Sequence, residues 1–172
     1  MAEKHINLHY KGYLLDEDGD CGESEHTLAL IDDDSVASLK NTKDVVEGYN
    51  NLRIEGKYIS FPEVLRNDVP KECFKEGVDE SSGFGWESLQ IPNCNFRFYW
   101  GDKKTPLEEA QRLFEEKLIC GDYFHKGNDV GFSEFTITGC VFDEMRIGGH
   151  DLHAELLDKC GKYVHILIDF PV

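Results

Sequence analysis

Strand-like patterns constrain the fold of this chain more than any other feature. Ile6, Leu8 and Tyr10 alternate with polar residues, which is the period of a half-buried β-strand. Residues 163–170 form a nearly continuous apolar run, which is typical of a strand at the centre of a sheet. Similar patterns predict strands at residues 27–31, 58–61, 96–100 and 134–141. Predicted strands outnumber predicted helices by about three to one without alternating with them, which favours an antiparallel sheet.

The sequence also predicts one long helix, at residues 105–120. Thr105 at the N-cap, Pro106 at the first helical position and Glu108 at the third match the capping-box pattern. Apolar residues at helical spacing follow and predict a stripe against the core: Leu107, Ala110, Phe114 and Leu118. Gly121 supplies a stop signal for this helix.

A shorter helix is expected at residues 151–159, with Asp151 as its N-cap and Gly161 just beyond its end. The paired glycines that precede it, Gly148 and Gly149, indicate a tight bend. Residues 67–95 are rich in Gly, Ser, Pro and charged residues, so we expect a long ordered loop there.

Together these patterns predict a single globular α+β domain over residues 1–172. It consists of a mostly antiparallel β-sheet packed by one long helix (about 105–120) and one short helix (about 151–159). With 172 residues, of which 40% are hydrophobic, the chain is long enough to bury an ordinary packed core without stabilising disulfide bonds.

The net charge is −16, from 34 acidic against 18 basic residues, and it limits the class of partner. Nucleic acids and anionic membrane surfaces require clusters of Lys and Arg, which the sequence lacks, so neither is expected as a partner. The acidic residues concentrate in residues 16–25 and 32–34, without neighbouring bases. One interpretation is that this charge only keeps the protein in solution, and the other is that it attracts a basic protein.

We expect the two acidic segments to place a negative potential at one end of the sheet and to dock a basic protein partner. Aromatic residues on loops supply the usual anchors of recognition surfaces. The candidate binding residues are Asp16, Asp18, Asp20, Asp32, Asp34 and Trp86. The spacing of Asp16, Asp18 and Asp20 resembles the start of a calcium loop, but Cys21 and Thr27 occupy positions that such a loop gives to Gly and Glu.

Six cysteines are spread along the chain without a C-x-x-C pair, which predicts reduced thiols and no structural zinc ribbon. The first residues lack the basic and apolar regions of a secretory signal. No apolar stretch approaches the roughly 20 residues that a membrane-spanning helix needs. These observations predict a cytoplasmic protein.

His150, Asp151 and His153 form the densest group of potential metal ligands. Two imidazoles and a carboxylate within four residues can supply most of a zinc or iron site, with His125 or His165 as a further ligand. A structural role competes with this interpretation, because Asp151 is also the expected N-cap of the short helix. Cys120, Asp122 and His125 suggest nucleophilic catalysis less strongly, because a thiolate is disfavoured at the C-terminal end of a helix.

The absence of a catalytic signature favours a small intracellular binding or inhibitor-type module over an enzyme, with a basic protein as its partner and no cofactor. The alternative is a small metal-dependent hydrolase centred on the cluster of His150, Asp151 and His153. A third hypothesis is a housekeeping domain whose acidity serves solubility alone. The sequence leaves the oligomeric state undefined.

Overall fold

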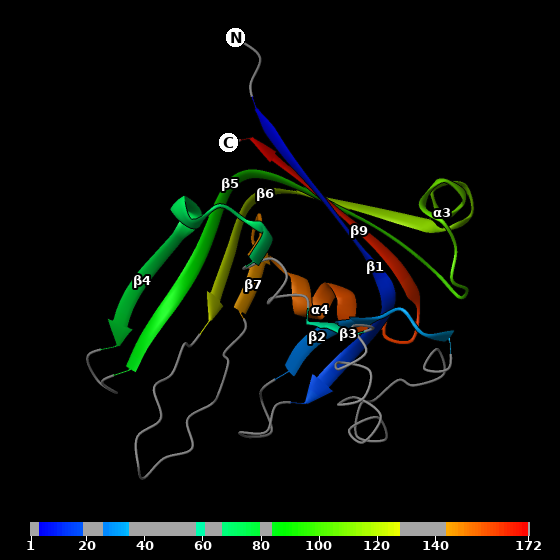
Figure 1. Ribbon diagram of the computed structural model, residues 1–172, viewed down its shortest axis with the longest axis horizontal. Helices are drawn as coiled ribbons and strands as arrows, with labels where there is room; N and C mark the ends of the chain where they lie inside the picture. Colours follow the sequence, from blue (N-terminus) through cyan, green and yellow to red (C-terminus); the bar gives the residue numbers. More distant parts are fainter. Residues whose placement is uncertain are drawn as a thin grey trace.

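One strongly curled, antiparallel β-sheet forms the framework of the protein (Figure 1). The structure is a computed structural model that describes residues 4–18, 26–34, 58–60, 67–79, 84–127 and 144–171. The described strands follow the order β3-β2-β1-β9-β5-β6-β7-β8, and β4 pairs with β5 beside this path. Their bounds are β1 His5–Asp18, β2 His26–Ile31, β3 Tyr58–Ser60, β4 Phe74–Asp79, β5 Phe84–Gly101, β6 Glu115–Gly127, β7 Glu144–Ile147, β8 His150–Asp151 and β9 Tyr163–Pro171.

Several predicted strands are confirmed, and the strand at residues 163–170 lies where its apolar pattern predicts. It forms β9, which pairs with β1 on one side and with β5 on the other. The strands predicted around residues 6–10 and 27–31 form part of β1 and β2, which pair antiparallel with Tyr13 opposite Ile31 and Asp18 opposite His26. The aromatic strand at residues 96–100 forms part of β5. The strand expected at residues 134–141 lies outside the described residues.

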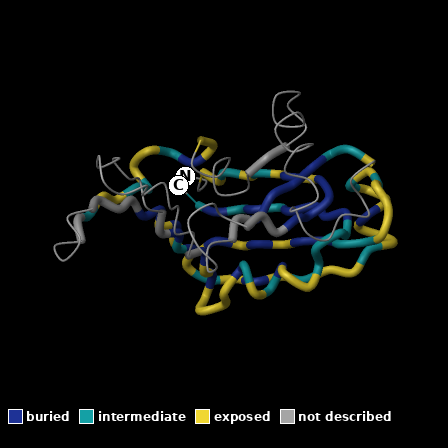
Figure 2. The backbone as a smooth tube through the Cα atoms, turned by 90° about the horizontal axis from the view of Figure 1, so that it is seen from below, coloured by how far each residue is buried: buried dark blue, intermediate teal, exposed yellow. Residues whose placement is uncertain are grey.

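The concave face of the sheet holds the main hydrophobic core. Alternate side chains of the central strands point into it, and the short helix α4 (Leu152–Leu157) lies inside the curl between β7 and β2 (Figure 1). Leu152 and Leu156 of this helix are buried against the sheet. The core also includes Leu14, Phe96, Phe98, Ile166, Ile168 and Phe170. Burial alternates with exposure along the strands, as Figure 2 shows.

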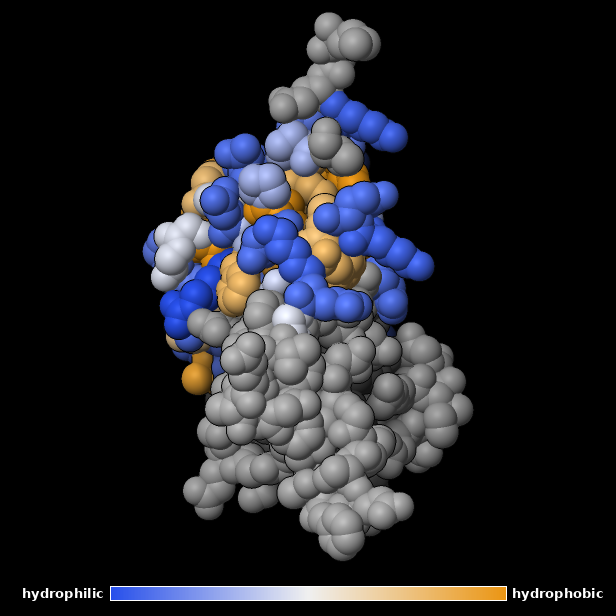
Figure 3. All heavy atoms as spheres, turned by 90° about the vertical axis from the view of Figure 1, so that its left-hand side faces the viewer, coloured by the Kyte–Doolittle hydropathy of each residue, from blue (hydrophilic) through white to orange (hydrophobic). Residues whose placement is uncertain are grey.

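The convex face of the sheet is divided into a covered end and an open end. At the covered end Tyr13, Leu15 and Tyr163 are buried, and the helix α3 (Leu107–Leu113) lies beside the ends of β5 and β6. At the open end the alternate positions of β1, β5 and β6 are exposed. Seen from the side of β4, the described surface is mixed, with hydrophobic side chains between hydrophilic ones (Figure 3).

The prediction of a sheet packed by a long helix is wrong, and so is the α+β class that rested on it. The helix expected at residues 105–120 ends at Leu113, and the following residues form the strand β6. Thr105 does not cap this helix, because Pro106 occupies the N-cap and the Thr105 hydroxyl donates to the carbonyl of Lys103. The protein is mostly antiparallel β-sheet, and the helices that the structure describes are short.

Two periodicities coexist in this segment, which explains the error. Ala110 and Phe114 fit a helix, whereas Ile119, Tyr123 and His125 fall on one face of a strand and are buried. Pairing with β5 over the length of β6 supplies backbone hydrogen bonds and burial that outweigh a modest local helix propensity. The stripe therefore ends at Phe114, and Leu118 is exposed on β6.

The prediction of a long loop at residues 67–95 is also wrong. A 3₁₀ turn, η3 (Lys71–Cys73), leads into β4, which pairs with the first part of β5 from Phe74 opposite Leu89 to Asp79 opposite Phe84. Gly77 and Gly85 contributed to the loop prediction, but both occupy paired positions in this hairpin.

No helix in the described part of the chain has the length and apolarity needed to cross a membrane.

Candidate functional site

Asp32 and Asp34, two of the predicted binding residues, lie directly after β2 and have partners within the chain. The Asp32 carboxylate is 2.7 Å from Nζ of Lys104 and accepts a hydrogen bond of 3.4 Å from the Tyr163 hydroxyl. The Asp34 carboxylate accepts a 2.8 Å hydrogen bond from the Tyr13 hydroxyl. Burial and these carboxylates raise the pKa of both tyrosines, so the hydroxyls remain donors at neutral pH.

The described parts of the two acidic segments lie near opposite ends of β2. Asp16 pairs with Leu28 and Asp18 with His26 at the start of β2, whereas Asp32 follows the other end of that strand. Leu28 and Asp32 are four positions apart along the extended chain, which corresponds to roughly 13 Å. The side chains of Asp16, Asp18 and Trp86 and the whole of Asp20 lie outside the described part of the structure.

A pair of histidines links the centre of the sheet to the segment before α3. Nε2 of the exposed His9 lies 2.9 Å from Nδ1 of the buried His165, and Nε2 of His165 lies 2.6 Å from the carbonyl oxygen of Thr105. A carbonyl only accepts hydrogen bonds, so His165 carries its proton on Nε2 and accepts from His9 through Nδ1. Burial lowers the pKa of His165, and partial desolvation of the ring together with the neighbouring His165 lowers the pKa of His9. The charge of Lys11 acts on both imidazoles in the same direction.

A hollow of about 510 Å³ lies beside α3, and we call it the α3 hollow. Trp100 and Leu113 line it together with Phe114, whose ring packs against the backbone of Gly101. The side chain of Leu113 is 68% exposed, which is unusual for a leucine next to two aromatic rings. Asp102 and Glu115 line the same hollow, as do Lys103, Thr105 and Lys162. Lys162 binds the Asp102 carboxylate and lowers its pKa.

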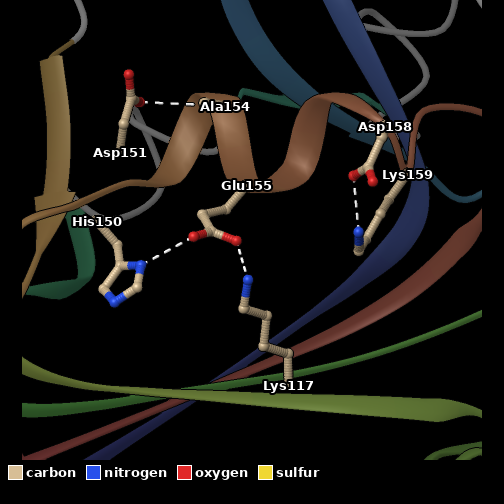
Figure 4. Close-up of polar contacts among 7 residues, drawn as sticks. All are labelled: Lys117, His150, Asp151, Ala154, Glu155, Asp158 and Lys159. Atoms are coloured by element: carbon tan, nitrogen blue, oxygen red, sulfur yellow. Dashed lines mark hydrogen bonds and ion pairs between the residues drawn. The ribbon is translucent and has the colours of Figure 1, made fainter.

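The cluster of His150, Asp151 and His153 has structural partners in the described part of the chain (Figure 4). Nδ1 of His150 lies 2.8 Å from a Glu155 oxygen, and the other Glu155 oxygen binds Lys117 of β6. Asp151 caps α4, because its carboxylate accepts hydrogen bonds from the backbone N–H groups of His153 and Ala154. Lys117 and then His150 hold the pKa of Glu155 below its usual range.

The described residues contain no group of three or more His, Cys, Asp or Glu side chains placed to hold a metal ion. The predicted N-cap role of Asp151 is confirmed, and so is the bend at Gly148 and Gly149, which have φ values of 53° and 85°. The alternative of a metal-dependent hydrolase therefore gains no support from the positions of His150 and His153.

Cys120, Asp122 and His125 do not form a catalytic arrangement. All three lie on β6, where Cys120 is exposed and His125 is buried, so their side chains point to opposite faces of the sheet. The Asp122 carboxylate accepts a hydrogen bond of 3.1 Å from the backbone of Asn93, where the pairing of β5 with β6 shifts register.

No family model matches the chain, and no curated protein or solved structure matches it significantly. The site must therefore be interpreted from its own geometry. Sequence reasoning missed the histidine pair, because His9 and His165 meet only through the pairing of β1 with β9. It also missed the α3 hollow, although Leu113 lies outside the apolar stripe of the expected helix and is an available signal for an exposed apolar site.

Proposed function

We propose that the protein is a binding module that recognises a basic protein through the α3 hollow and the acidic residues near it. The observation that carries this proposal is the exposed side chain of Leu113 beside Trp100 and Phe114. Large apolar and aromatic side chains around a hollow, with charged residues at the rim, have the composition of a protein-recognition hot spot.

Acidic residues beside the hollow support a basic partner, although Lys103 and Lys162 balance Asp102 and Glu115 in its lining. Glu108 and Glu109 are exposed on α3, and Glu115 follows its end. Lys104 immediately precedes Thr105 and binds Asp32, so the predicted acidic segment at residues 32–34 lies next to the chain that leads into α3. With a net charge of −16, the protein attracts a cationic partner over long range and speeds its encounter.

The other predicted binding residues have a secondary role in this proposal. Asp16 and Asp18 pair with the opposite end of β2, so in this proposal they contribute to the overall field instead of to direct contact with the hollow. Asp20 lies outside the described residues and adds its charge to the same field. Trp86 remains a predicted second anchor, and its backbone pairs with Gly77 of β4.

The test compares matched variants of the two exposed leucines. A partner captured from native lysate at low salt is purified, and its association and dissociation rates are measured with the wild type, with Leu113→Ala and with Leu157→Ala. Leu157, which ends α4, is 47% exposed and does not line the hollow. We expect Leu113→Ala to weaken binding by about tenfold or more through faster dissociation, and Leu157→Ala to change it less than about twofold.

A second set of variants tests the charge. Changing Asp16, Asp18, Asp20, Asp32 and Asp34 to Asn is expected to slow association and to flatten its dependence on salt, with a smaller effect on dissociation. The proposal is wrong if Leu113→Ala leaves the affinity unchanged, or if association with the wild type does not respond to salt.

A further inference from the structure

The open end of the convex sheet face carries a second depression, separate from the α3 hollow, which we call the outer-face groove. It has a volume of about 400 Å³ and crosses the four adjacent strands β1, β9, β5 and β6. The strand register places its side chains in two rows. Asn7, Asp169 and Asn95 are paired across the sheet in the first row, and His9, Leu167, Arg97 and Leu118 are paired in the second.

Opposite charges face this groove without pairing to each other. Asp169 is opposite Asn95, two residues from Arg97, and such diagonal neighbours have backbones roughly 7–8 Å apart. Asp169 instead contacts Nδ1 of His5 at 2.8 Å, and Nε of Arg97 contacts Glu116 at 3.5 Å. The side chains are 42% exposed in the first pair and 44% exposed in the second, so both charges remain accessible to a ligand.

The remaining lining residues complement the two charges. The Arg97 contact uses Nε, and a guanidinium has two further nitrogens that can donate in parallel to a carboxylate. Asn7 and Asn95 flank Asp169 with amides, which can both donate and accept hydrogen bonds. Leu118, which is 46% exposed, and Leu167 give the second row an apolar surface.

We propose that the outer-face groove binds a free α-amino acid with an apolar side chain. The ligand ammonium contacts Asp169 between the two asparagines, the ligand carboxylate contacts Arg97, and the apolar side chain lies on Leu118 and Leu167. A ligand that carries both charges a few ångströms apart can contact both groups at once, in addition to their partners His5 and Glu116. The groove volume lies within the range of small-molecule sites. This inference is independent of the function proposed for the α3 hollow.

The test is an NMR titration of the full chain with L-leucine and two analogues that each lack one charge. N-acetyl-leucine has no ammonium, and leucinamide has no carboxylate. We expect saturable shifts of the Asn7, Asn95 and Arg97 signals with leucine, at a dissociation constant on the order of 1 mM because the groove is open. Each analogue is expected to bind at least about tenfold more weakly.

Variants then assign the site. Arg97→Gln and Asp169→Asn are each expected to weaken leucine binding by about tenfold or more, whereas Arg146→Gln, on the exposed surface of β7, leaves it unchanged. If Asp169→Asn does not fold, Asn95→Ala replaces it, with a smaller loss expected. The proposal is overturned if leucine produces no saturable shifts up to about 20 mM, if both analogues bind as well as leucine, or if the folded variants retain full affinity.

Discussion

His165 shows at the scale of a single residue how a buried polar group acquires a role that its sequence context does not reveal. It accepts from His9 on β1 and donates to Thr105 before α3, and its ring lies 6.5 Å from that of Phe114 after α3. One side chain therefore contacts the chain on both sides of a seven-residue helix. Protonation of His165 at Nδ1 would direct its new N–H group at the N–H group of His9, because His9 already donates to that nitrogen.

The first prediction concerns the pH dependence of stability. A histidine whose folded pKa is below its unfolded value contributes most above about pH 6.5, and this contribution is lost as the pH falls through the folded pKa. His165 meets this condition through burial and Lys11, while Asp32 and the Thr105 carbonyl oppose the shift. We expect the free energy of unfolding to lose on the order of 1 kcal/mol from this site between pH 7.5 and pH 5.

Urea unfolding of the wild type and of His165→Phe at several pH values measures this contribution. The variant should show a smaller decrease toward acid pH, whatever its stability at neutral pH. His150→Gln removes the imidazole that contacts Glu155, and it measures the separate contribution of that pair to the pH dependence. Equal pH dependence in wild type and His165→Phe would exclude the neutral histidine pair as its source.

At the scale of elements, the sequence predicted those structures whose determinants are local. The cap at Asp151, the glycine bend before it and the apolar run of β9 each depend on a few neighbouring residues. The β4–β5 hairpin and the first part of β6 depend instead on pairing between distant segments, which overrides local propensity. The outer-face groove and the histidine pair could not be predicted from local sequence either, because each combines side chains from different strands.

The second prediction concerns the contact that holds α3 to the sheet. A Cβ atom at Gly101 would lie 2.3 Å from the nearest atom of the Phe114 ring, so Gly101→Ala must displace that ring. We expect the substitution to reduce the free energy of unfolding by about 1–3 kcal/mol.

A double-mutant cycle identifies the cause of this loss. In a Phe114→Ala background, the cost of Gly101→Ala should fall to less than half, because the ring that obstructs the new methyl group is absent. Additive losses, measured by urea unfolding, would show that the two residues do not interact.

At the scale of the whole molecule, the sheet is completed by β9, which lies between β1 and β5. Its side chains Ile166, Ile168 and Phe170 are buried in the main core, and its backbone pairs on both edges. In the part of the sheet that the structure describes, β1 and β5 are joined through this strand alone, so neither neighbour can substitute for it.

The third prediction follows from this position. A chain that stops at residue 162 should fail to fold, and a synthetic peptide of residues 163–172 added in trans should restore the near-ultraviolet circular dichroism of the full chain. A control peptide with Ile166→Asp and Ile168→Asp should not restore it, because it would bury two charges. A stable tertiary signal from the shortened chain alone would contradict the central role of β9.

The late place of β9 in the chain has a consequence for biosynthesis. During translation β1 and β5 leave the ribosome well before the strand that joins them, so each exposes an unpaired edge and an apolar face while synthesis continues. Exposed edges of this kind invite pairing with other chains. We therefore expect the nascent chain to depend on chaperones that bind apolar segments until residues 163–171 emerge from the exit tunnel.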